Sequence, residues 1–174
     1  MYRSKAKRLT ICAILISMAL VLSYIERFIP LQLLVPLPGI KLGLANIVTL
    51  IALYMLDVKS AFFILACRCL MGSMFGGGVT GLMFSLTGGM LSVLVMCLAR
   101  RARWLSVYGV SILGAAAHNV GQIGAAIVLM QSTYIGTYLP YLLIVALFTG
   151  FATGSGASGV LRVMYAAGGK RRFT

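Results

Sequence analysis

Long apolar segments separated by short polar or glycine-rich interruptions make up almost the whole chain. Six such segments can be marked, and we expect each to form a transmembrane helix, at about 9–25, 42–56, 60–75, 79–99, 107–130 and 138–163. A spanning helix needs about 20 apolar residues. The second and third segments would reach only roughly 23–24 Å, slightly less than a hydrocarbon core. The pattern predicts an all-α integral membrane bundle of six transmembrane helices, forming a single transmembrane domain over residues 1–174.

The connection between the first two segments is unusual because it is apolar. Residues 28–41 carry prolines at 30, 36 and 38, which break helix continuity. Two readings stay open for this connection: a cap packed over the helix ends on the outer face, or a short hairpin lying on the lipid.

Composition supports the membrane assignment. Hydrophobic residues make up 61% of the 174 residues and charged residues only 10%, whereas soluble domains average about 45–50% and 25%. The start of the chain resembles a signal peptide, with basic residues before an apolar run, but the run lacks a small-x-small cleavage site. We therefore expect an uncleaved first helix. The four cysteines lie inside apolar runs with no zinc-binding spacing, so we expect reduced packing residues.

The distribution of charge predicts the orientation in the membrane. Fifteen Lys and Arg face two acids, giving a net charge of +13. With the N-terminus inside, twelve of the fifteen bases lie on the inner side, as the positive-inside rule requires. We expect both termini to be cytoplasmic, in a multi-pass protein of the cell (plasma) membrane whose surroundings are the lipid bilayer. Because the membrane orientation already explains the basic residues, we do not expect nucleic acid to be a partner.

Arg68 is the main ionisable residue expected within the membrane. Such residues are costly and mark functional sites by default. Three interpretations remain open: contact with an anionic ligand or a cavity, a structural hydrogen-bonding role, and snorkelling of the side chain toward the membrane surface. A second polar group, His118, Asn119 and Gln122, forms one strip on the fifth helix, either as interhelical hydrogen bonds or as part of a site. Asn46 adds an amide on the second helix.

A binding site follows if these side chains converge below the outer face. Glu26, Arg27 and Lys41 would then shape its mouth, and the cations would outnumber the carboxylate. Such a field favours an anionic or strongly polar ligand. Arginine binds phosphate or carboxylate through two parallel hydrogen bonds.

Several kinds of catalytic site are missing from the sequence. There is no phosphate-binding loop of the G-x-x-x-x-G-K-[ST] type. No aspartate pair is present to hold magnesium on a diphosphate, and no Ser-His-Asp set can be built. We therefore expect no metal, no cofactor and no enzymatic activity in this chain.

Rows of small residues recur at the spacing used for close helix packing. They include Ala13 and Ser17, then Ala19 and Ser23, on the first helix, and further rows at 81/85/89, 117/121/125 and 150/154/158. Packing within the monomer is the simpler reading of each row. Docking to another membrane subunit is the alternative.

Three sequence blocks resemble one known family. They are SYIERFIP at 23–30, PGIKLGLANIVTL at 38–50 and GAAAHNVGQ at 114–122. These blocks are similar to the Gx transporter family, whose members are often labelled heptaprenyl diphosphate synthase component I. The resemblance covers about residues 9–165.

The family also resembles the substrate-binding S subunits of energy-coupling factor (ECF) transporters. That likeness implies a six-helix bundle that captures a small molecule outside the cell. Its partners would be a transmembrane coupling subunit and cytoplasmic ATPase subunits, with Ala13 and Ser17 matching the docking pattern of the first helix. The family label implies the alternative, a membrane component associated with heptaprenyl diphosphate biosynthesis. Since prenyl elongation needs clustered aspartates, such a component would be non-catalytic.

Overall fold

The computed structural model describes residues 5–29 and 40–167, and every regular element in them is helical. In chain order these are α1 (Lys5–Ile25), the 3-10 turn η1 (Glu26–Phe28), α2 (Asn46–Met55), α3 (Val58–Gly72), the π-helical turn η3 (Ser73–Gly77), α4 (Gly78–Ala99), α5 (Val107–Met130), the 3-10 turn η4 (Thr133–Tyr138) and α6 (Leu139–Ala167). The predicted all-α fold is confirmed. Within residues 5–29 and 40–167, five helical segments are long and apolar enough to cross a membrane, and α2 is shorter.

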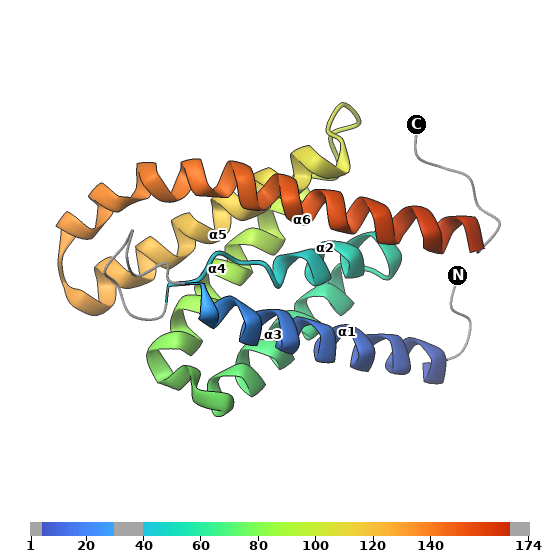
Figure 1. The fold of residues 1–174 in the computed structure, drawn as a ribbon, viewed down its shortest axis with the longest axis horizontal. Helices are drawn as coiled ribbons and strands as arrows, with labels where there is room; N and C mark the ends of the chain where they lie inside the picture. The colour runs from blue at the N-terminus through green and yellow to red at the C-terminus, as the bar shows by residue number, and fades with distance from the viewer. Residues whose placement is uncertain (1–4, 30–39, 168–174) are drawn as a thin grey trace.

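The helices form one bundle that runs back and forth between two ends (Figure 1). The first residues of α1 and the last residues of α6 lie at the same end of the bundle. Helices α4, α5 and α6 pack in sequence against one another, and α1 packs against α3. The short α2 contacts α1, α3, α4, α5 and α6, so it occupies the centre of the bundle.

Glycines bring the helix backbones of α4, α5 and α6 close together. A Cβ added at Gly121 would lie 2.8 Å from the Cα of Gly88, and one added at Gly150 would lie 2.6 Å from the Cα of Ile112. Contacts this short leave no room for any side chain, since core atoms are already close-packed. These members of the small-residue rows therefore serve packing within the monomer.

Helix α2 forms the core of the bundle but begins later than the sequence pattern predicts. Seven of its ten residues are buried. The predicted start at Leu42 is wrong because Gly43 has φ of +81°, a left-handed conformation that interrupts a right-handed helix. Residues 40–43 are irregular and 44–45 form a turn before the helix begins at Asn46.

The end of the bundle that holds the α1 start is tied together by Asp57. Its side chain caps α3 by accepting a hydrogen bond of 2.7 Å from the Ser60 backbone N–H. It also pairs with Arg8 of α1 at 2.5 Å. The Ser60 N–H and then Arg8 stabilise the ionised form, which lowers the pKa of Asp57 below its usual value of 3.8.

Two further sequence expectations concern connections and cysteines. Most of the predicted cap over residues 28–41 falls in 30–39, which lie outside the described residues. Within the described part of the chain, all four cysteines are free thiols.

Candidate anion-binding pocket

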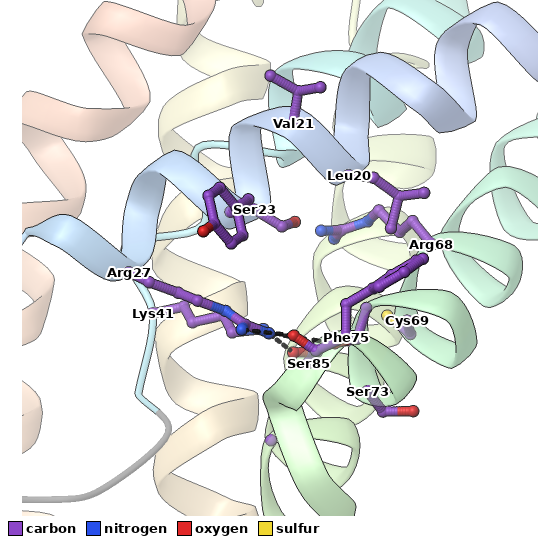
Figure 2. A pocket seen from close by; sticks show the side chains of 13 residues that line it. Leu20, Val21, Ser23, Arg27, Lys41, Arg68, Cys69, Ser73, Phe75 and Ser85 are labelled. Atoms are coloured by element: carbon purple, nitrogen blue, oxygen red, sulfur yellow. Dashed lines mark hydrogen bonds between the residues drawn. The ribbon is translucent and has the colours of Figure 1, made fainter.

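A cavity of about 260 Å³ lies between the second half of α1, the end of α3 with η3, the start of α4, and Lys41 (Figure 2). Its polar lining residues are Ser23, Arg27, Lys41, Arg68, Ser73 and Ser85. Apolar side chains from α1 and η3, including Leu20, Val21 and Phe75, form much of the remaining wall. The cavity thus combines three cationic side chains with a largely apolar surface.

Arg68 reaches into this cavity from the α3 side (Figure 2). It is only 5% exposed, and its Nη2 donates a hydrogen bond of 3.1 Å to Oδ1 of Asn46. Its Nε is buried and has no hydrogen-bond partner among the described residues. A buried guanidinium is costly unless its charge is compensated, so an anion in the adjoining cavity is favoured.

Lys41 enters the cavity from the irregular segment that precedes α2. Its Nζ donates a hydrogen bond of 3.0 Å to the Ser85 hydroxyl of α4. The Gln122 amide fixes its backbone on both sides: the Lys41 N–H donates to Gln122 Oε1 at 2.9 Å, and Gln122 Nε2 donates to the Lys41 carbonyl at 2.8 Å. An irregular backbone inside a membrane bundle is tolerated when protein side chains supply its hydrogen-bond partners, as Gln122 does here.

Arg27 lines the same cavity, and both of its terminal nitrogens already donate a hydrogen bond to the protein. Nη1 donates to the Phe75 carbonyl at 2.7 Å and Nη2 to the Gly72 carbonyl at 3.2 Å. These carbonyls belong to the end of α3 and the turn after it, where a cation is favourable. Arg27 therefore contributes charge to the cavity and also closes the end of a helix.

Glu26 supplies the one carboxylate beside these cations within the described residues. It is 5% exposed and accepts a hydrogen bond from the Gly43 N–H. Lys41 and Arg68 are among its charged neighbours. With three cations and one carboxylate, the site keeps a net positive charge, which favours an anion.

Five of the eight predicted site residues do not line the cavity: Glu26, Asn46, His118, Asn119 and Gln122. His118 is buried between two glycines: a Cβ added at Gly43 would lie 2.8 Å from His118 Cδ2, and one at Gly88 would lie 2.9 Å from His118 Nδ1. Asn46 lies beside His118, against the same glycine. Both residues therefore shape the surroundings of the cavity without lining it.

Asn119 is directed elsewhere. Its Nδ2 donates a hydrogen bond of 2.7 Å to the Leu142 carbonyl of α6. This bond joins α5 to α6, which is one of the two roles that the sequence left open for the strip. The structure thus brings Glu26, Lys41, Asn46, Arg68 and Gln122 into one linked group and separates Asn119 from it.

Sequence reasoning missed three serines of the lining, Ser23, Ser73 and Ser85. Ser23 and Ser85 belonged to small-residue rows that were interpreted as helix-packing faces. In the structure Gly81 and Ser85, four residues apart on α4, both line the cavity. Small size at these positions leaves the space open, so spacing alone does not separate a packing face from a cavity wall.

A metal centre has no candidate in the described part of the chain, because no three His, Cys, Asp or Glu side chains gather there. The positions of the two carboxylates explain this result. Glu26 lies beside the cavity, which adjoins the C-terminal end of α3. Asp57 caps the N-terminal end of α3.

Comparisons with known proteins identify one family. The searches against curated proteins and against solved structures gave no match. The family model for heptaprenyl diphosphate synthase component I matches residues 15–160, most of the range expected from the three sequence blocks. The chain belongs to the heptaprenyl diphosphate synthase component I family.

Proposed function

We propose that this chain is the membrane-embedded substrate-binding subunit of an energy-coupling factor type importer, and that it captures a small polar or anionic molecule. The observation that carries the proposal is Arg68, a nearly fully buried guanidinium that bonds Asn46 and lines the cavity. Lys41 and Arg27 line the same cavity, and a single nearby carboxylate leaves the positive charge in excess. An anion placed there gains charge-assisted hydrogen bonds that water cannot match in such a site.

The proposal includes an orientation in the plasma membrane with both termini in the cytoplasm. Residues 40–45 and α2 would together make the sixth crossing. The shared end of α1 and α6 (Figure 1) supports an even number of crossings. In this orientation that end receives most of the bases of the sequence, as the positive-inside rule favours. Labelling with a membrane-impermeant maleimide tests this orientation: a cysteine replacing Tyr134 should react from outside, and one replacing Lys59 should not. The reverse pattern would reject it.

The proposed docking surface for the coupling subunit lies on α1. Ala13 and Ser17 are both exposed, and the Ser17 hydroxyl donates to the Ala13 carbonyl at 3.0 Å within the helix. This leaves a shallow, small-residue surface on which another helix can pack closely.

A second candidate function is favoured by the name of the family. The chain would then be a non-catalytic membrane component associated with heptaprenyl diphosphate biosynthesis. In both cases we propose that the chain is not an enzyme, because Glu26 and Asp57 are held at separate places and are each engaged in structural hydrogen bonds.

Purification with partners separates the two functions. The tagged chain is extracted from native membranes in mild detergent, and the proteins that remain bound are identified. Coupling and ATPase subunits support the importer, whereas a soluble prenyl diphosphate synthase supports the alternative. Ala13→Leu should release the coupling subunit, and Ala152→Leu, at an exposed alanine of α6, should not. Recovery of neither kind of partner would contradict both assignments.

A further inference from the structure

The space between α1 and α4 belongs to the cavity. Among the described residues these two helices make no contact with each other, although both line the cavity. Gly81 of α4 is buried, yet a Cβ added there would meet no atom within 4 Å. It therefore faces the empty space between the two helices.

The edge of this space is apolar and exposed. Val21, Tyr24 and Phe75 line the cavity, and they are 59%, 57% and 67% exposed. All three belong to segments long and apolar enough to span a membrane. In a bilayer such side chains face hydrocarbon. The space therefore leads from the charged interior toward lipid.

The size of the cavity adds a third observation. At about 260 Å³ it lies just below the usual range of about 300–1,000 Å³ for small-molecule sites. It is large enough for a charged head group, and a longer ligand has to extend through the space between α1 and α4.

We infer that the ligand is an amphiphile whose phosphate-like head lies against Arg68 and Lys41 and whose hydrocarbon chain leaves between α1 and α4 into the membrane. The inference rests on the proposed anion-binding function and narrows its ligand class. A hydrocarbon chain along the apolar edge gains free energy for each methylene removed from water. The buried cations provide the specificity for the head group.

Binding of three matched probes tests the inference. Purified protein in a neutral detergent is mixed with dodecyl phosphate, inorganic phosphate or dodecanol, and bound mass is measured by native mass spectrometry. Dodecyl phosphate should bind at least about 10-fold more tightly than inorganic phosphate, the equivalent of burying about two methylenes. Dodecanol, which lacks the charge, should not bind. Dioleoyl phosphatidic acid tests whether a membrane lipid supplies the head and chain, since its binding would indicate a lipid and binding of dodecyl phosphate alone a single-chain ligand.

Two variants distinguish the contribution of the ligand's hydrocarbon chain to binding from that of its head group. Gly81→Leu should fill the space between α1 and α4 and weaken dodecyl phosphate binding at least about 10-fold, with a smaller effect on inorganic phosphate. Gly124→Leu is its control, because that helical glycine also has open space around it and lies away from the cavity. Lys41→Gln should weaken both phosphates.

The outcomes distinguish the amphiphile from the simpler anion site. Equal affinity for inorganic and dodecyl phosphate, both lost in Lys41→Gln, would overturn the amphiphile and leave the anion site intact. Dodecyl phosphate binding that is unchanged by Lys41→Gln would also overturn it, because the chain alone would then explain binding. Failure of both phosphates to bind would contradict the proposed function itself.

Discussion

Gly43 is the residue on which the geometry of the site most depends. Its φ of +81° lets the chain turn into α2, and its N–H binds Glu26. Its lack of a side chain makes room for Asn46 and His118, since a Cβ would lie 2.8 Å from an atom of each. Conformation and close packing thus require the same glycine.

Gly43→Ala should therefore destabilise the protein by about 1–3 kcal/mol, from a strained backbone and a forced shift of its neighbours. Thermal unfolding in detergent measures the loss. Gly124→Ala is the matched control, and with open space around it it should be neutral or slightly stabilising. Equal unfolding temperatures for the two variants would show that the turn at Gly43 tolerates a side chain.

Asp57 gives a pH dependence at the other end of the bundle. Its folded pKa is lowered below 3.8, first by the Ser60 N–H and then by Arg8, so the unfolded chain binds the proton more tightly. The stability contributed by the ionised form is complete at neutral pH and is lost as pH falls through the folded pKa. Because the Arg8 pair is largely exposed, the effect should be less than about 1 kcal/mol.

Asp57→Asn isolates this contribution, because asparagine also caps helices but carries no charge. The variant should be slightly less stable than the parent at neutral pH, and the difference should shrink below about pH 4. Unfolding followed across that range checks it. A difference that grows in acid would mean that Asp57 is not stabilised as the carboxylate.

At the scale of elements, the irregular segment 40–45 connects the site to the bundle. The Gln122 side chain of α5 is hydrogen-bonded to both the N–H and the carbonyl of Lys41. The Glu26 carboxylate accepts a hydrogen bond from the N–H of Gly43, two residues further along the chain. These side chains replace the hydrogen bonds that a helix would have provided.

Gln122→Leu should remove both bonds to Lys41 and cost about 1–3 kcal/mol for each polar group left buried without a partner. Hydrogen exchange should become faster at the Lys41 amide, while the centre of α2 stays protected. Thr87→Val serves as control, since that hydroxyl bonds only carbonyls of its own helix. Unchanged exchange at Lys41 would show that other groups hold the segment.

The apolar pattern was sufficient to predict most helices. The segment at 107–130 coincides with α5, because its apolar run ends at polar residues on both sides. The predicted start of α2 is wrong because Leu42 and Leu44 fit an apolar helix and a buried irregular segment equally well. The positive φ of Gly43, which the apolar pattern does not reveal, makes the segment irregular. An apolar sequence indicates that a segment is buried but not that it is helical, and Leu42 is buried in a segment that is not helical.

The candidate site was only partly predictable for a related reason. Arg68 and Lys41 stand out because charge is rare in an apolar chain. Ser85 gives no such signal, because a small polar residue on a helix suits packing as well as a cavity. The direction of Asn119 toward Leu142 depends on how α5 and α6 cross, which no local pattern records.

For the whole molecule, the bundle separates two charged ends with different roles. One end joins Arg8 to Asp57 and, in the proposed orientation, receives most of the bases of the sequence. Toward the other, Arg27, Lys41 and Arg68 surround a cavity with one carboxylate beside it. We propose that the charge excess of the sequence serves orientation in the membrane at the first end and an anion site at the second.

The most direct test of that site is native mass spectrometry of the protein released from its own membranes in mild detergent. The wild type should carry a bound anionic molecule, which Lys41→Gln and Arg68→Gln should lose. Lys59→Gln, a change of an exposed lysine at the α3 start, should keep it. A wild type free of any anionic molecule, or the same bound mass in all three variants, would contradict an anion-binding pocket.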